Sequence, residues 1–229
     1  MKKEKIVVLS LGGSLIIPKT GFDIKFLKAF KKLIIEQIKK GQRFVIVCGG
    51  GATARNYQLA VKNVSELVSE DVDWIGIHAT RLNAHFMRTI FRQWANPEVI
   101  KNPTQKIKWT EPVLIGAGWK PGCSTDYDAV LVARTYGAKE ITNLSNIKYV
   151  YDSDPKENPK AKKLTKISWD DFRKIVGDKW IPGANLPFDP IASKEAAKQK
   201  MKVIVMSGAN IKEVQKAIEG KKFQGTLIG

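Results

Sequence analysis

Three glycine-rich turns in this chain are of a type that can hold phosphate. They are Gly12-Gly13-Ser14, Gly49-Gly50-Gly51 and the longer segment 116–126, which also carries hydroxyl side chains. Glycine lets phosphate oxygens approach backbone N–H groups, and a helix that starts at such a turn adds the partial positive charge of its N-terminus. Any one of these turns is more often simple chain geometry. Three of them in one chain favour a polyphosphate site, and with it nucleotide binding.

The two best-known nucleotide-binding motifs are absent. Gly12-Gly13-Ser14 does not continue into the Lys-Ser/Thr pair of a P-loop, and no G-x-G-x-x-G motif opens a helix. The chain shows no Ser-His-Asp set and no paired-carboxylate site. Phosphoryl transfer to an acceptor that is already ionised requires neither, because the protein mainly aligns the reactants and surrounds the moving group with cations.

The segments around these turns must place them, and their pattern is that of an α/β fold. Apolar runs of strand length alternate with amphipathic helical stretches, which predicts a mainly parallel sheet covered by helices. We expect strands at residues 6–11, 44–48, 113–115, 140–144 and 203–206, and shorter ones at 99–100 and within 223–228. We expect helices at residues 23–40, 73–94, 127–136, 168–177, 190–200 and 211–219, and a short helix after Gly51 that contains Arg55 and Tyr57. The three turns then lie at the mouth of the sheet.

Composition limits the class of protein. The chain has 229 residues, 43% of them apolar, and 39 Lys and Arg against 22 Asp and Glu give a net charge of +17. This is an ordinary globular composition, which predicts one packed core and a single domain over residues 1–229, and the charge indicates anionic partners. The lysines of the first helix lie mostly off its apolar stripe, so we interpret them as a solvated face. Nucleic-acid binding would rest on net charge alone.

The apolar runs span only a few residues, so no membrane span is expected. Residues 1–5 are interpreted as a solvated lead-in to a strand and not as a signal peptide. Cys48 and Cys123 do not make a disulfide framework, and with only two histidines there is no zinc-ligand spacing. A reducing cytoplasm fits this composition best.

The order of motifs resembles the uridylate (UMP) kinases, in the archaeal-type branch of the amino-acid-kinase superfamily. The resemblance covers essentially the whole chain. It rests on Leu11-Gly12-Gly13-Ser14, Gly49-Gly50-Gly51-Ala52-Thr53-Ala54-Arg55, residues 73–84, Pro121-Gly122-Cys123-Ser124-Thr125-Asp126, Ser145-Asn146, Val150-Tyr151, Asp154-Pro155, Asp189-Pro190 and Gly225-Thr226-Leu227-Ile228.

This resemblance implies a three-layer αβα sandwich that transfers a phosphoryl group from ATP to UMP, with magnesium as cofactor and usually in a hexamer. The N-terminal half would mainly bind UMP and the C-terminal half ATP. Partners would be these small molecules and copies of the same chain, not membrane or nucleic acid.

On the UMP side, the resemblance implies that Gly50 contacts the phosphate and Asp73 the ribose hydroxyls. A carboxylate that accepts from two hydroxyl donors is chemically sensible there; the alternative for Asp73 is a helix N-cap. The loop around uracil and phosphate would comprise Trp119, Lys120, Pro121, Gly122, Cys123, Ser124 and Thr125, with Thr125 contacting the base. Cys123 itself is interpreted as a bystander thiol.

On the ATP side, the resemblance implies phosphate contacts from Gly13, Ser14, Gly51 and Arg55, and adenosine contacts from Ser145, Tyr151 and Asp154. The alternative role for Tyr151 is that of an aromatic side chain packed in the core.

Asp126 and Asp189, with Arg55, are the candidates for the catalytic centre. The two acids would order magnesium or cationic groups. Either acid is equally well explained as a helix cap.

Two departures from the family pattern bear on function. Many relatives carry a lysine in the first strand where Ser10 stands here, so another cation must substitute, and Arg55, Lys120 and Lys194 are the candidates. Lys148-Tyr149 replaces an acid and a glycine of the adenosine segment, which leaves ATP binding less certain than UMP binding. A non-catalytic nucleotide- or anion-binding protein on the same fold therefore remains the alternative.

Overall fold

The structure, a computed structural model, describes residues 6–155, 157–179 and 186–229. The expected lead-in at residues 1–5 and most of the loop expected from residue 180 lie outside these residues. The main sheet has the strand order β3-β4-β2-β1-β5-β9-β10-β8. Its strands are β1 (Ile6–Leu11), β2 (Arg43–Cys48), β3 (Ala95–Ile100), β4 (Val113–Gly116), β5 (Glu140–Ser145), β8 (Lys166–Ile167), β9 (Lys202–Ser207) and β10 (Thr226–Ile228).

Its paired neighbours run parallel except β9 and β10, which pair antiparallel. Two short strands, β6 (Val150–Tyr151) and β7 (Lys163–Leu164), form a separate antiparallel pair. The helices are α1 (Gly13–Ile16), α2 (Ile24–Lys39), α3 (Gly51–Lys62), α4 (Ser69–Ile90), α5 (Thr125–Tyr136), α6 (Trp169–Val176), α7 (Pro190–Lys198) and α8 (Ile211–Ile218). The mainly parallel α/β fold is confirmed.

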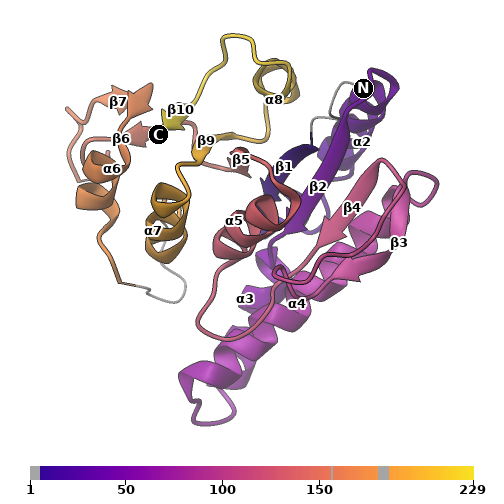
Figure 1. Cartoon of the computed structure of the whole chain (residues 1–229). Coiled ribbons are helices and arrows are strands. Elements are labelled where there is room, and N and C mark those ends of the chain that lie inside the picture. Colours follow the sequence, from indigo (N-terminus) through magenta and orange to yellow (C-terminus); the bar gives the residue numbers. More distant parts are fainter. Residues whose placement is uncertain (1–5, 156, 180–185) are drawn as a thin grey trace.

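The central strands are buried on both faces, which explains their unbroken apolar sequences. Leu9 and Ile46 point into a core shared with α2, α4 and α8, whereas Val8 and Val45 point into a second core shared with α5, α6 and α7. Successive strand residues alternate between these cores because the side-chain period of a strand is two. The result is a three-layer αβα sandwich (Figure 1).

Helix ends follow the capping residues in most places. Asp23 caps α2 by accepting the Phe26 N–H, and Ser168 caps α6 by accepting the Asp171 N–H, both as the sequence indicates. The expected start of α4 at Asp73 is wrong, because the helix begins at Ser69. Glu70 and Asp71 already place negative charge in its first turn, which the helix dipole favours.

The segment after α4 also differs from expectation. The helix ends at Ile90 and not near Trp94, and β3 spans Ala95–Ile100 although Pro97 lies within it. Proline is tolerated in this strand because β3 is the edge of the sheet and its register shifts between Ala95 and Val99.

The helices α3 and α4 pack against each other and project together beyond the sheet (Figure 1). Among the described residues, no helix has the length and apolar character that crossing a membrane requires.

Candidate functional site

The site lies where the parallel strands end. β1, β2, β4 and β5 are neighbours in the sheet and run parallel, so the turns that follow Leu11, Cys48, Gly116 and Ser145 share one edge. The chain leaves β1 toward the layer of α2 and leaves β4 toward the layer of α5 on the opposite face. Such a switch of face at the carboxyl ends of strands is the usual location of ligand sites in α/β proteins.

The first two glycine-rich turns interlock. A Cβ atom on Gly13 would overlap the backbone N of Gly51, and Gly51 itself has φ +63°. The Ala52 N–H donates to Ile17 O over 2.9 Å, which ties the two turns together. Close backbone packing therefore accounts for part of the need for glycine here. The same packing also places the two candidate phosphate loops side by side.

A cavity of about 340 Å³ opens beside these turns and falls in the size range of small-molecule sites. It is lined by Gly50, Gly51, Ala54, Arg55, Gln58, Val72, Asp73, Gly76, Ile77, Thr80, Gly118, Cys123, Ser124 and Thr125. Seven of the sequence-derived candidates meet there: Gly50, Gly51, Arg55, Asp73, Cys123, Ser124 and Thr125. Trp119, Lys120, Pro121 and Gly122 belong to the loop that borders the cavity and are not part of its lining.

Helix α4 fixes that loop along one face. Asp73 Oδ2 accepts the Gly122 N–H over 2.7 Å, and Thr80 Oγ1 accepts the Gly118 N–H over 2.8 Å. Arg81 Nη2 donates to Trp119 O over 3.0 Å. The three side chains lie on one side of the helix, because Thr80 and Arg81 follow Asp73 by seven and eight residues, which is about two helical turns.

Sequence reasoning missed part of this helix. Buried Asn83 donates from Nδ2 to Gly49 O and Gly50 O over 2.8 and 3.0 Å and so fixes the second glycine turn. Thr80 and Asn83 were given no role in the sequence. Thr80 lies seven residues, close to two helical turns, after Asp73, and Asn83 follows Thr80 by three residues, so this spacing is the signal that could have identified them.

A second group of polar side chains lies behind the cavity. Ser10 donates from Oγ to Asp126 Oδ1 over 2.9 Å, and the Asp189 N–H donates to Asp126 Oδ2 over 3.3 Å. Burial raises the pKa of Asp126 to about 6, against the lowering effect of the Ser10 hydrogen bond. Burial likewise raises the pKa of Asp189.

The alternative role as a helix cap holds for Asp189 and not for Asp126. Asp189 does cap α7, since its Oδ1 accepts the Ala192 N–H over 2.6 Å. Asp126 is not the cap of α5, because Ser124 takes that position and accepts the Tyr127 N–H, while Asp126 lies in the first turn. Asp126 is therefore free of a capping role and faces the Ser10 hydroxyl.

The three candidate substitutes for the missing lysine lie in different places. Arg55 is exposed and lines the cavity. Lys120 is exposed, with its ammonium 4.2 Å from the centre of the Trp119 ring, and Lys194 is exposed on α7. Arg55 is thus the candidate that the fold brings to the cavity wall.

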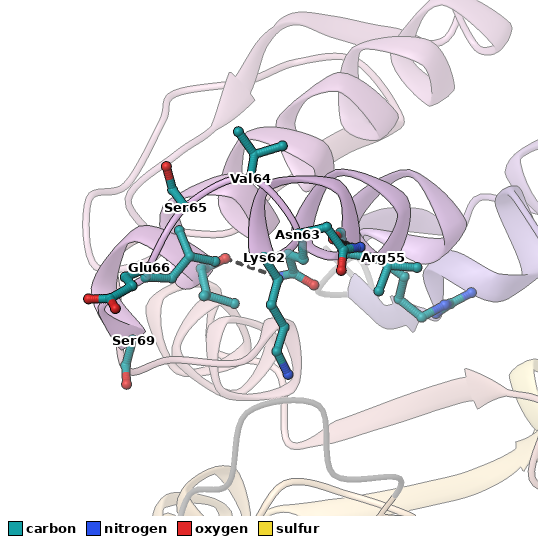
Figure 2. A pocket seen from close by; sticks show the side chains of 11 residues that line it. Arg55, Lys62, Asn63, Val64, Ser65, Glu66 and Ser69 are labelled. Carbon is teal, nitrogen blue, oxygen red and sulfur yellow. Dashed lines mark hydrogen bonds between the residues drawn. The ribbon is translucent and has the colours of Figure 1, made fainter.

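A larger hollow of about 1020 Å³ lies beside the end of α3 (Figure 2). The cavity and this hollow share Arg55, Gln58 and Val72. Figure 2 shows Arg55 and Lys62 on α3, with Ser65 and Glu66 on the connection that leads to α4. The larger hollow is therefore lined by two basic side chains, Arg55 and Lys62, and by the acidic side chain of Glu66.

The C-terminal half holds a separate cavity of about 480 Å³ at the start of α8. Lys148 lines it together with Ser207, Ala209, Asn210, Ile211, Lys212, Glu213 and Gln224. Ser145 ends β5, Tyr151 is half-buried in β6, and Asp154 is exposed in the loop beyond. Lys148, one of the departures from the family pattern, is thus a wall of this cavity.

Comparison with known proteins agrees with this geometry. The model of the amino acid kinase family matches residues 5–207. A uridylate kinase of Thermococcus kodakarensis is 32% identical over 97% of this chain and 98% of its own, and one of Sulfurisphaera tokodaii is 36% identical over 83% and 85%. This chain belongs to the uridylate kinases of the amino acid kinase family.

Solved structures of this family share the fold. The crystal structure of the Archaeoglobus fulgidus uridylate kinase superposes with a TM-score of 0.83 at 30% identity, covering 98% of this chain and 100% of that one. A UMP kinase of Bacillus anthracis superposes with a TM-score of 0.78 at 22% identity, covering 100% of this chain and 97% of its own. The αβα sandwich of this uridylate kinase is thus the fold of its relatives.

Proposed function

We propose that this uridylate kinase binds UMP in the cavity between α3, α4 and the loop 116–124, and transfers to it the terminal phosphoryl group of ATP. The observation that carries the proposal is the convergence of Gly50, Arg55, Asp73 and Thr125 on one cavity of about 340 Å³. These groups come from separate segments and match the needs of a nucleoside monophosphate, because a helix start and a guanidinium can bind its phosphate and a carboxylate can accept from its ribose hydroxyls.

Each cavity group has a task that its chemistry supports. Gly50 at the start of α3 offers the positive end of a helix to the phosphate. The Asp73 carboxylate accepts the Gly122 N–H at one oxygen and retains acceptor capacity for ribose hydroxyls. Arg55 supplies a guanidinium that can hold phosphate oxygens and balance charge during transfer.

The ATP side is supported by the position of the glycine turns. Gly51 lines the UMP cavity and Gly13 packs against Gly51, with Ser14 next in the chain. The cavity beside Lys148 and Asn210 lies in the C-terminal half, where the resemblance implies adenosine. Ser145, Tyr151 and Asp154 are proposed as adenosine contacts.

Magnesium fits as an ion that arrives with ATP. Within the described ranges, no group of three acidic, cysteine or histidine side chains is arranged to hold a metal. Magnesium in kinases needs only one or two carboxylates besides phosphate oxygens, so Asp126 and Asp189 suffice as the protein's contribution. When bound, the ion would neutralise charge on the phosphates.

A coupled assay for ADP tests this function. ADP production from ATP should require UMP and should be much slower with AMP or with no acceptor. ADP production that ignores UMP would contradict the proposal. Nucleotide binding without any turnover would favour the alternative, a binding protein on the same fold, for which the Ser10–Asp126 hydrogen bond in place of a lysine is the supporting observation.

We also propose that the chain assembles with copies of itself, as the family resemblance implies for a hexamer, and that it works in the cytoplasm, where ATP and UMP are free. The exposed apolar side chains of Tyr57 on α3 and of Trp74 and Leu82 on α4 line one hollow. Such a patch favours protein contacts over solvent. Light scattering of the purified chain measures the assembly directly, and a monomer would contradict it.

A further inference from the structure

Asp128 is a buried acid that the proposed reaction does not use. It lies in the first turn of α5 and is 1% exposed. Its Oδ2 accepts the Trp119 N–H over 3.2 Å, and its Oδ1 is buried with no hydrogen-bond partner. Because a buried carboxyl group is costly unless it makes compensating contacts, its one strong contact is informative.

Arg81 binds the other backbone polar group of the same residue. Its Nη2 donates to Trp119 O, so both backbone polar groups of Trp119 are bound by side chains, one from α4 and one from α5. The charge of Arg81 also favours ionised Asp128, while Asp126 and Asp189 oppose it. The backbone of Trp119 is therefore held by hydrogen bonds from two helices, α4 and α5, which lie on different sides of the loop.

Trp119 lies in the loop that forms one wall of the cavity. Gly118 precedes Trp119 and lines the cavity, and Cys123, Ser124 and Thr125 follow in the same loop and line it too. From the side of α4, Asp73 and Thr80 also bind this loop, at Gly122 and Gly118. Asp128 is the anchor from the side of α5.

We propose that Asp128 and Arg81 are positioning residues that clamp the backbone of Trp119 from both sides and thereby hold the loop 116–124 in the shape that receives the nucleoside monophosphate. This inference rests on the proposed function only for its kinetic consequence. The clamp itself is a property of the chain without nucleotide. Removing it should loosen the acceptor site and leave the ATP site unchanged.

Hydrogen exchange of the nucleotide-free chain tests the clamp. In Asp128→Leu and in Arg81→Met, amides of the segment 117–123 should exchange at least tenfold faster than in the unmodified chain, while β1 and β9 stay protected. Arg134→Met is the matched control, because Arg134 lies on α5 like Asp128 and pairs with Glu195. Unchanged exchange in 117–123 in both variants would overturn the clamp.

Steady-state kinetics tests the effect of the clamp on UMP binding. Asp128→Leu should raise KM for UMP about tenfold, corresponding to the loss of one buried hydrogen bond, with KM for ATP and kcat within about threefold. Asp128→Asn keeps an acceptor for the Trp119 N–H and should restore KM for UMP to within about threefold. Because both side chains hold the backbone of one residue, Trp119, Asp128→Leu with Arg81→Met should cost less than the two separate effects combined.

The outcomes separate the two proposals. Faster exchange in a chain that does not phosphorylate UMP would retain the clamp and defeat the proposed function. Normal UMP turnover with unchanged KM in Asp128→Leu would overturn the positioning role and leave the function intact. If Asp128→Leu does not fold, Arg81→Met and Asp128→Asn decide: KM for UMP should rise with the first and not with the second, and equal KM in both would overturn the clamp.

Discussion

Ser10 at the end of β1 donates a hydrogen bond from its hydroxyl to Oδ1 of Asp126 in α5, over 2.9 Å and across 116 residues of sequence. Ser10 stands at the position where the family resemblance implies a lysine. The contact joins the strand that precedes the first glycine turn to the helix that follows the acceptor loop. A neutral hydroxyl can hold this carboxylate but cannot balance its charge, so the pKa of Asp126 stays raised, at about 6.

The first prediction concerns pH and turnover. If ionised Asp126 is needed, kcat should be constant above pH 7 and fall as pH drops through about 6, where the carboxylate takes up a proton. Ser10→Ala removes a contact that lowers this pKa, so the acidic limb should move to higher pH. A pH–kcat profile of both proteins measures the shift. Identical limbs would show that Asp126 does not govern turnover.

The second prediction concerns pH and folding. Burial raises the pKa of Asp128 to about 8, and the charges of Asp126 and Asp189 add to this while Arg81 opposes it. A raised carboxyl pKa stabilises the fold below the unfolded value and loses that stabilisation as pH rises toward the folded value. Between pH 5 and 8 the free energy of unfolding should therefore fall, by on the order of 1 kcal/mol per pH unit for each such group.

Urea unfolding followed by circular dichroism measures this slope. Asp128→Asn should flatten it, since the amide does not titrate. A free energy of unfolding that rises over the same range would contradict the raised pKa.

The third prediction concerns Asp73. Asp73→Ala removes both the proposed ribose acceptor and the acceptor of the Gly122 N–H, so UMP affinity should fall at least tenfold. ATP affinity should change by less than about threefold. Calorimetric titration with each nucleotide measures both. Equal losses for the two nucleotides would argue against an acceptor-side role.

The fourth prediction concerns the interlocked turns. A methyl group on Gly13 would meet backbone atoms of Gly49 and Gly51, which cannot move aside as a flexible side chain does. Gly13→Ala should therefore destabilise the fold by about 3 kcal/mol or more. Gly41→Ala is the control, because a methyl group there meets nothing within 4 Å although its φ is +84°. Urea unfolding compares them, and a mild Gly13→Ala would show that the turns can separate.

The fifth prediction concerns the two thiols. Burial, with the charge of Asp128 contributing, raises the pKa of Cys123 to about 11, so this thiol is a poor nucleophile near neutral pH. Cys48 is fully buried and its pKa is raised as well. Iodoacetamide at pH 8 should modify Cys123 slowly, more slowly still with UMP present, and Cys48 only on unfolding. Rapid modification of native Cys123 would contradict a raised pKa.

Much of the architecture was readable from the sequence. β1 was predicted with its observed bounds, and the caps Asp23 and Ser168 were identified from residue type. The order of motifs also predicted the family. These features depend on neighbours in the chain, because strand periodicity, turns and capping are local properties. The late start predicted for α4 shows the limit, since Asp73 has the chemistry of a cap and lies inside the helix.

The tertiary structure decided which candidates share a site. Asp73 and Gly122 are 49 residues apart, and Ser10 and Asp126 are 116 apart, so no local pattern reveals that they touch. Asp128 drew no attention in the sequence, because a carboxyl group acquires its raised pKa only when packing removes water from it. The sequence thus determined the elements and their family. The folded chain determined the cavity and the clamp around Trp119, since burial and distant contacts exist only once the layers have packed.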